Sequence, residues 1–291
     1  MASGMWTAAA GAAAQSQNLD IISNNLANTD TPAFKKDLPT FKEYLVTLER
    51  DHDPTDIPRG PIKDKDFYPL DGRDQSHVVM DGTHTSFRQG NLHVTQAQFD
   101  VAMDGPGFIE VNTPNGIRYT RQGSLKVESN GRLVTTEGFP VLASAAAGLA
   151  GALNSNPLQP NLNGANANQG TGDVASRYIN LRDKGSHFTI TGEGEIYAGD
   201  SLIAKLNVTE FKDLKKLKKS GGQIYENLDP LNKAKAAQTI VRQGVLETSN
   251  VNPIEEMTNM IKANRLFEQD LKALKTYGEL MGKEANEVGK L

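Results

Sequence analysis

The amino-acid sequence predicts an α+β fold, in which long N- and C-terminal helices pair as a coiled coil and a β-rich antiparallel domain is inserted between them. Apolar side chains recur at helical spacing near both ends of the chain, and the middle is rich in short alternating runs and turn residues. Two helices that are far apart in the sequence and could pair are typical of an assembly subunit rather than of an enzyme.

At 291 residues the chain is long enough for two ordinary domains. We expect four parts: an N-terminal helix within residues 1–36, an extended connector at 37–75, a β-rich domain at 76–228, and a return segment with a second long helix at 229–291. A low-complexity insertion of small residues, Asn and Gly interrupts the β-rich domain at 143–176.

The composition excludes several classes of protein. The net charge of −4 argues against a dedicated nucleic-acid binder. The absence of cysteine removes disulfides, thiol catalysis and Cys-ligated metals. No apolar run is long enough to span a membrane, and no basic residue precedes Lys35, so we expect no cleaved signal peptide. The protein is then cytosolic or exported without loss of a leader.

The N-terminal helix is expected over residues 5–28. Its stripe at spacings of three and four comprises Ala12, Gln15, Leu19, Ile22 and Leu26. Thr31-Pro32 ends it, because the residue before a proline is pushed out of the α region. A buried helix of an ordinary domain is the alternative interpretation. In the connector, Phe41, Leu45 and Leu48 suggest a short amphipathic helix before a segment rich in Pro, Asp and Lys.

Strand patterns dominate residues 76–211. Asn115-Gly116 and Asn130-Gly131 each lie between strand-like runs and predict two hairpins with type I′ turns. Gly105 and Gly107 predict a tight corner rather than a phosphate-binding loop. The alternating run from Leu202 to Phe211 is the strongest strand signal. The basic run Lys212–Lys219 is expected to be a solvated face or loop.

The C-terminal helix is expected to start near Pro253, with Asn252 as its N-cap and Glu255 and Glu256 in its first turn. Its apolar stripe continues for more than four heptads, a length that favours a coiled coil. The stripe comprises Met257, Met260, Asn264, Phe267, Leu271, Leu274, Gly278, Met281, Ala285 and Val288. The predicted assembly interface is Leu19, Ile22, Leu26, Met257, Met260, Phe267, Leu271, Leu274 and Met281.

Nothing in the sequence forms a convincing catalytic or metal-binding constellation. The five histidines are dispersed, and none has a partner at the spacing of a helical metal site. Glu193 and Glu195 could do acid–base chemistry, but their glycine-rich setting favours a solvated turn. Ser124 lacks the spacing of a nucleophile elbow. A secreted β-rich cell-wall enzyme or binding protein is the alternative from another class.

Three blocks of the chain together resemble bacterial flagellar rod and hook proteins. They are SNNLANTDTPAFKKD (23–37), FDVAMDGPGFIEV (99–111) with YTRQGSLKVESNGRLVT (119–135), and GVLETSNVNPIEEMTNMIKANRLFE (244–268). Within this family, Pro253 and the run 265–268 are more similar to proximal-rod members. Distal-rod and hook-type members are the alternative.

The resemblance implies a structural subunit. In this family both terminal helices form a coiled coil that lines a hollow axial tube, and the β domain lies outside them. The tube transmits motor torque and passes exported subunits. The expected partners are copies of the chain, other rod proteins, the flagellar type III export apparatus and surrounding ring proteins. The resemblance implies no cofactor, and it places the chain in the periplasm-spanning rod of the basal body.

Overall fold

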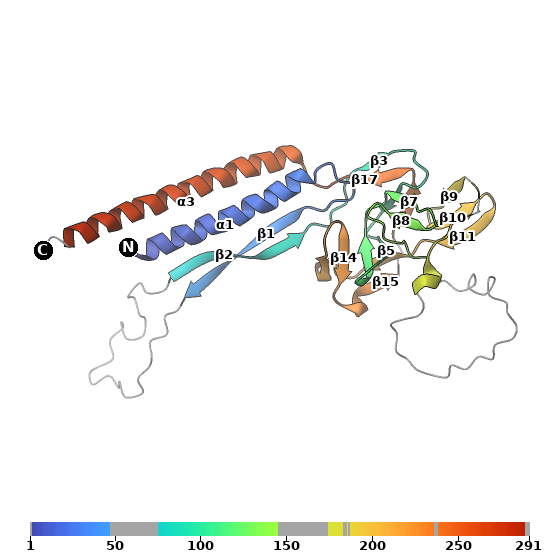
Figure 1. The fold of residues 1–291 in the computed structure, drawn as a ribbon, viewed down its shortest axis with the longest axis horizontal. Helices are drawn as coiled ribbons and strands as arrows, with labels where there is room; N and C mark the ends of the chain where they lie inside the picture. The colour runs from blue at the N-terminus through green and yellow to red at the C-terminus, as the bar shows by residue number, and fades with distance from the viewer. Residues whose placement is uncertain are drawn as a thin grey trace, which may run out of the picture. The chain divides into compact units, whose positions relative to one another are not determined.

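The computed structural model describes residues 2–46, 75–144, 174–182, 185, 187–235 and 238–288. The chain divides into two compact units (Figure 1). The helical unit comprises the residues up to Ala27, Asp37–His84 and the residues from Asn252 onward; the β unit comprises Asn28–Lys36 and Thr85–Val251. Leu48 and most of the predicted connector and insertion lie outside the described residues.

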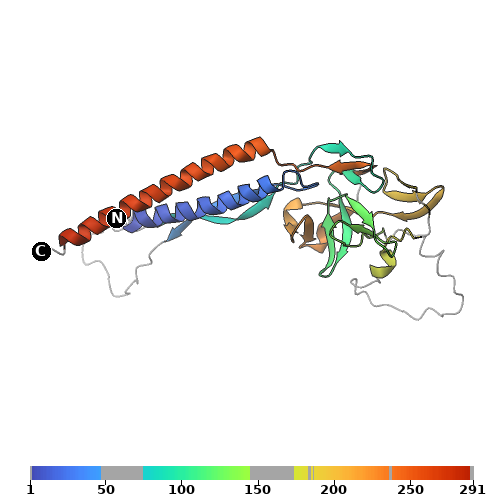
Figure 2. The same ribbon diagram turned by 45° about the horizontal axis from the view of Figure 1, so that its top comes forward.

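Two long helices and a two-stranded ribbon form the helical unit. Helix α1 (Ala2–Ala27) and helix α3 (Pro253–Val288) lie side by side and run in opposite directions. The ribbon consists of β1 (Asp37–Val46) and β2 (Gln75–Thr85). In both views α1 lies between α3 and the ribbon (Figures 1 and 2). None of the helices in the described residues has the length and apolar content needed to cross a membrane.

The start of α3 confirms the predicted cap. The side-chain oxygen of Asn252 accepts a hydrogen bond from the Ile254 backbone N–H at 3.1 Å, and its carbonyl accepts one from the N–H of Glu256 at 3.0 Å. Pro253 takes the first helical position, where its missing N–H costs nothing. The acidic first turn complements the helix dipole.

The amphipathic helix predicted around Phe41 and Leu45 is wrong, because these residues belong to strand β1. Pro39 disfavours a helix interior, and Thr40, Phe41, Tyr44 and Val46 are residue types that prefer strands. Pairing with β2, about thirty residues later in the chain, then decides the conformation.

Short antiparallel strands build the β unit. A six-stranded sheet has the order β13-β14-β6-β5-β12-β15, a three-stranded sheet has the order β11-β10-β9, and three pairs are β16–β4, β17–β3 and β7–β8. The strands are β3 (Leu92–Val94), β4 (Val101–Asp104), β5 (Phe108–Thr113), β6 (Gly116–Thr120), β7 (Leu125–Val127), β8 (Leu133–Thr135), β9 (Phe188–Ile190), β10 (Glu195–Ala198), β11 (Ser201–Lys205), β12 (Val208–Phe211), β13 (Leu217–Lys219), β14 (Ile224–Asn227), β15 (Lys233–Lys235), β16 (Ile240–Gln243) and β17 (Val245–Glu247). Three short 3₁₀ turns complete the unit: η1 (Val174–Arg177), η2 (Leu214–Lys216) and η3 (Pro230–Asn232).

Both predicted hairpins are present, but their turns are not type I′. That turn needs a positive φ at both central residues, and only the glycines have one: Gly116 at +99° and Gly131 at +85°. In the first hairpin Thr113 pairs with Gly116, so Pro114 and Asn115 form the loop. Proline fixes φ near −65°, which excludes type I′ there. The glycines instead supply the left-handed residue that follows a tight turn.

The strongest predicted strand, Leu202 to Phe211, is divided between two sheets. β11 pairs with β10, whereas β12 pairs with β5 and β15. The break lies at Leu206 and Asn207; the Asn207 N–H bonds to the Leu142 carbonyl at 3.1 Å. The alternation predicts the strands but not this change of partner. Strands β13 to β17 were not predicted from the sequence, because their polar residues hide their strand character; β13 lies in the basic run that was expected to be a solvated face or loop.

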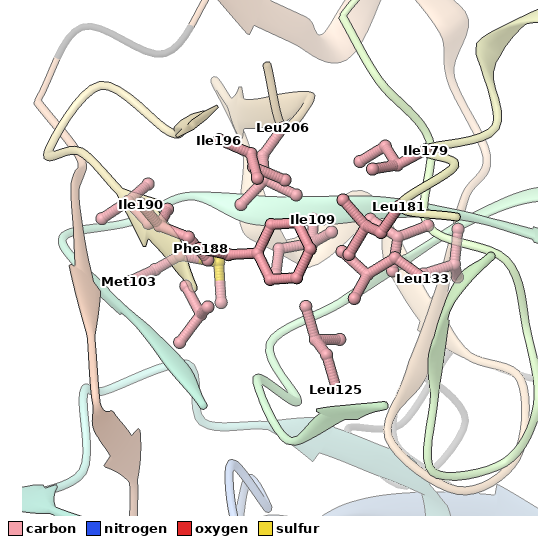
Figure 3. Packing of buried hydrophobic residues seen from close by; sticks show 14 residues of the cluster. Met103, Ile109, Leu125, Leu133, Ile179, Leu181, Phe188, Ile190, Ile196 and Leu206 are labelled. Atoms are coloured by element: carbon pink, nitrogen blue, oxygen red, sulfur yellow. The ribbon is translucent and has the colours of Figure 1, made fainter. Parts of the chain in front are cut away.

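The main core of the β unit is a continuous aliphatic cluster. Phe188 lies among Met103, Ile109, Leu133 and Ile190, with further aliphatic side chains around them (Figure 3). A second, aromatic cluster contains Phe108, Tyr119, Phe211, Leu217 and Tyr225. Its rings meet edge to face, with centroids 4.8–5.7 Å apart. Gly107 allows the close approach of Thr239 and Val208, since a Cβ there would lie 2.7 Å from both side chains.

Candidate assembly interface

The face of α3 that meets α1 overlaps only half of the predicted stripe. On α3, Met260, Phe267 and Leu274 are half-buried. On α1, Ile22 is buried and Leu19 and Leu26 are half-buried. Met257, Leu271 and Met281 are exposed, by 52%, 45% and 37%. The buried and half-buried stripe on α3 is Glu256, Met260, Ala263, Phe267, Asp270, Leu274 and Tyr277. Every second position of the predicted stripe is therefore replaced by the residue before it, so that Glu256, Ala263, Asp270 and Tyr277 take the places of Met257, Asn264, Leu271 and Gly278.

Glycines in α1 explain this shift. A Cβ on Gly4 would lie 2.9 Å from the ring of Tyr277, and a Cβ on Gly11 would lie 3.2 Å from the Asp270 carboxylate. Both pairs are seven residues apart on their helices, so the contact repeats once per heptad in antiparallel register. Large or polar side chains of α3 thus fit over the glycines of α1. A search for apolar residues alone does not find these positions.

Four large apolar side chains of α3 are exposed outside the stripe that meets α1. They are Ile254, Met257, Ile261 and Leu271, with exposed fractions of 75%, 52%, 56% and 45%, and Leu271 lies at the edge of that stripe, between Phe267 and Leu274. The first three repeat at spacings of three and four and so lie on one side of the helix. Met281 is exposed for another reason: it lies a turn beyond Tyr277, which already meets Gly4 at the start of α1.

Asn25 joins the end of α1 to the start of β1. Its side chain is buried, donates to the Asp37 carbonyl at 2.8 Å, and accepts from the Asp37 N–H at 3.0 Å. This two-bond contact satisfies both backbone groups of Asp37. Asn25 lies in the SNNLANTDTP block, so the structure gives that block a physical role in orienting the chain after the helix.

A buried ionic cluster lies in the β unit. The Lys35 Nζ is 2.6 Å from Glu247 Oε1, and the Arg121 Nε is 3.1 Å from Glu247 Oε2. The side chains of Lys35 and Glu247 are fully buried, and that of Arg121 is 2% exposed. Lys35 also donates to the Arg88 carbonyl at 2.9 Å, and the Gly90 N–H donates to Glu247 Oε1 at 2.8 Å. We call Lys35, Arg121 and Glu247 the Glu247 cluster.

Two cations share one carboxylate in this cluster, so the cluster carries a net positive charge that is buried away from solvent. Burial, and then the charge of Arg121, lower the pKa of Lys35 from 10.5 to about 8, although Glu247 opposes the shift. The Arg121 guanidinium also lies 5.3 Å from the centre of the Phe108 ring. Glu247 is therefore the group on which the buried charges depend.

Asn250 extends the cluster into a junction of three segments. Its Oδ1 accepts from the Lys36 N–H at 2.8 Å, and its Nδ2 donates to the carbonyls of Ser86 and Arg88 at 2.8 and 2.9 Å. Ala33, at a φ of +60°, donates its N–H to the Glu247 carbonyl at 2.8 Å. The segments that follow α1, follow β2 and precede α3 in the chain thus converge on Glu247 and Asn250.

The sequence analysis missed every residue of this junction. Lys35, Arg121, Glu247 and Asn250 lie inside the three blocks that carry the resemblance. No local signal singles them out, because each block holds other charged residues as well. Only the fold shows that these charges meet.

The residues that were considered for catalysis lie in a turn and in strand contacts of the β unit. Glu193 and Glu195 both contact Lys205 at 3.2 Å, and Gly194 has a φ of +80° in the turn between them. Glu193 thus lies in the predicted solvated turn, whereas Glu195 begins strand β10 and is half-buried. Ser124 forms an isolated bridge with Asp100. Across the part of the chain that the structure describes, no three His, Asp or Glu side chains are grouped as a metal site requires.

Three family models match this chain. Residues 5–35 match the flagella basal body rod protein model, residues 102–198 match the flagellar hook protein FlgE/F/G D1 domain, and residues 242–288 match the flagellar basal body rod FlgEFG protein C-terminal model. Their order along the chain is that of the three blocks described above.

Curated relatives match over nearly the full length. The flagellar basal-body rod protein FlgG of Buchnera aphidicola subsp. Schizaphis graminum is 30% identical over 291 residues, covering 96% of this chain and 97% of the relative. FlgG of Borreliella burgdorferi is 30% identical over 296 residues, covering 96% of each. FlgF of Caulobacter vibrioides is 27% identical over 276 residues, covering 94% of this chain and 93% of the relative.

Proposed function

The chain belongs to the family of bacterial flagellar basal-body rod proteins, and we propose that its terminal helices pair as a coiled coil lining a hollow axial tube, with the β unit outside. It is a structural subunit of the rod. Membership of a structural family also indicates a non-enzymatic protein.

The observation that carries the proposal is that α3 has two apolar faces. One face packs on α1, where the side chains of Tyr277 and Asp270 lie over Gly4 and Gly11. The other, Ile254, Met257, Ile261 and Leu271, has no partner among the described residues of the single chain. Large exposed apolar patches mark interaction sites. We infer that helices of neighbouring copies cover this second face and so build the wall of the tube.

We propose the partners that membership of this family implies. They are copies of the chain, other rod proteins, and the flagellar type III export apparatus, with the surrounding ring proteins as further contacts. The exported subunit lies in the periplasm-spanning part of the rod. The role needs no cofactor.

The place within the rod has two candidates. Pro253 and the run 265–268 support the proximal rod, whereas the FlgG relatives at 30% identity favour the distal rod. Basal bodies from cells lacking the chain distinguish them. A proximal role predicts that the rod proteins beyond it are missing, and a distal role predicts that the proximal rod proteins are retained.

Leu271→Asp tests the proposed tube. A carboxylate in a dry helical contact costs several kcal/mol, and the cost recurs at every copy. Cells with Leu271→Asp should export the subunit but build no rod or filament from it, while the β unit keeps its melting temperature. Gln269→Asp is the matched control, since it adds the same charge at an exposed position of α3 about half a turn around the helix from Leu271. Motile cells carrying Leu271→Asp would rule out the packed second face.

A further inference from the structure

Two exposed leucines project from a rigid turn of the β unit. Leu228 is 63% exposed and Leu231 is 82% exposed, on either side of Asp229-Pro230. We call this pair the leucine knob. Among the described residues of the β unit, few large apolar side chains are as exposed as these two.

The turn that carries the knob is held by a dense set of hydrogen bonds. Asn232, which is buried, donates to the Asp213 carbonyl at 2.8 Å and accepts from the Asp213 N–H at 2.8 Å. Asp229 accepts from the Leu231 N–H at 3.0 Å and from Lys216 Nζ at 2.7 Å. Asn227 donates to the Asp229 carbonyl at 2.6 Å. The backbone that carries the leucines is therefore held in place, which lowers the entropy lost on binding.

The segment that contains the knob is rich in lysine. Residues 212–235 hold seven lysines and three acidic residues, a net charge of +4 in a chain of net charge −4, so the rest of the chain carries −8. Some of these lysines lie on β13 and β15, the two edge strands of the six-stranded sheet. Charged residues on short edge strands oppose the addition of another strand. Contacts at these two edges are thus left to side chains rather than to pairing with another strand.

We propose that the leucine knob docks on an acidic, apolar surface of a second copy of this chain. Charge complementarity carries the choice of occupant, because residues 212–235, which contain the knob, have a net charge of +4 and the remainder of the chain is acidic. A contact between two knobs is disfavoured, since it would bring two segments of charge +4 together. The contact is therefore heterologous, with different surfaces on the two copies, and heterologous contacts generate rings or helical assemblies. The inference rests on the proposed rod function and adds a contact outside the helices.

The test replaces both leucines in cells that make this chain as their only copy. Leu228→Ser/Leu231→Ser should be exported with an unchanged melting temperature, and its amount in purified basal bodies should fall about tenfold, as loss of about 1.4 kcal/mol per contact implies. Val94→Ser/Ile240→Ser is the matched control, because these side chains are 65% and 53% exposed outside the lysine-rich segment. Its incorporation should stay near that of the wild type. Equal incorporation of the knob variant, or an equal loss in the control, would overturn the proposal.

A second measurement tests whether the leucine knob docks on another copy of the chain, even if the double variant does not fold. A photo-crosslinking amino acid at position 231 should give a light-dependent adduct between two copies, with the acceptor peptide on an acidic surface outside residues 212–235. An adduct to another protein, an adduct between two knobs, or no adduct would each refute the docking site. Absence of the wild-type chain from basal bodies would instead refute the proposed function.

Discussion

Replacing Glu247 with Gln should destabilise the β unit severely, because every partner of this carboxylate is a donor. Lys35 and the Gly90 N–H donate to Oε1, and Arg121 donates to Oε2. Glutamine keeps one acceptor but turns an NH₂ group toward one of these donors. It also leaves two buried cations without a counter-charge.

The geometry sets the size of the effect. At 2.6 and 3.1 Å, each charge pair has an attraction of about 5–6 kcal/mol for an effective dielectric constant of about 20, and desolvation offsets much of it. Removing one partner of a buried pair costs roughly 3–5 kcal/mol. For a unit of this size that corresponds to a decrease in melting temperature of roughly 6–20 °C.

Lys35→Met should behave differently. It removes the surplus cation and leaves the neutral pair of Arg121 and Glu247. The lowered pKa of Lys35 shows that its charge is disfavoured in the folded protein. We expect a smaller cost than for Glu247→Gln, because the variant leaves one balanced buried pair rather than two cations without a counter-charge. Glu226→Gln, which breaks a partly exposed pair with Arg118, is the surface control and should cost at most about 1 kcal/mol.

Urea unfolding followed by near-ultraviolet circular dichroism measures these changes. The tyrosine bands report on the aromatic cluster around Tyr225 in the β unit, whereas the single tryptophan, Trp6, lies in α1 and is 60% exposed. The reasoning predicts that Glu247→Gln is far more damaging than Lys35→Met. Equal costs for the two variants, or a cost below about 1 kcal/mol for Glu247→Gln, would refute it.

Three further predictions concern pH, the predicted insertion and the helix contact. The pKa of Lys35 is about 8 in the folded protein and 10.5 ordinarily, so between these pH values the unfolded chain binds more protons than the folded one. The free energy of unfolding of the wild type should therefore rise with pH across that interval relative to that of Lys35→Met. A difference between the two free energies that does not change with pH would contradict the pKa shift. Deleting residues 145–170 from the full chain should leave the cooperative unfolding transition of the β unit, since the Ala143 N–H bonds to the Arg177 carbonyl at 2.8 Å and Arg177 pairs with Glu110 at 2.8 Å; loss of the transition in a melting curve would show that the segment is structural. Gly4→Val should reduce incorporation into basal bodies because its side chain meets Tyr277, and Tyr277→Ala should restore it, whereas failure of the second change to rescue would argue against a steric origin.

Local pattern was enough to predict the helices. The spacing of Leu19, Ile22 and Leu26, and the cap at Asn252, place α1 and α3 correctly because helix period and capping are properties of neighbouring residues. The turn glycines and most short strands follow for the same reason. The amphipathic helix around Phe41 failed because pairing with a distant strand outweighed a weak local pattern.

The residues that each helix face contacts could not be predicted in the same way. Hydrophobicity selects Leu271 and Met257 for the contact between α1 and α3, but the helices meet through Asp270 and Tyr277 over Gly11 and Gly4. The Glu247 cluster depends on residues more than 120 positions apart, brought together only by the folded β unit. Such contacts leave no periodic signal in a single sequence.

The most direct test of the central account is a disulfide between the terminal helices in the assembled rod. The chain has no cysteine, and a Cβ on Gly11 lies 3.5 Å from the Cγ of Asp270, so Gly11→Cys/Asp270→Cys places two thiols within bonding reach. After mild oxidation, subunits from purified basal bodies should carry this bond within one chain, and the Ser16→Cys/Asp270→Cys control should not. Basal bodies that contain the subunit with both thiols free, or with bonds only to other proteins, would contradict the paired terminal helices.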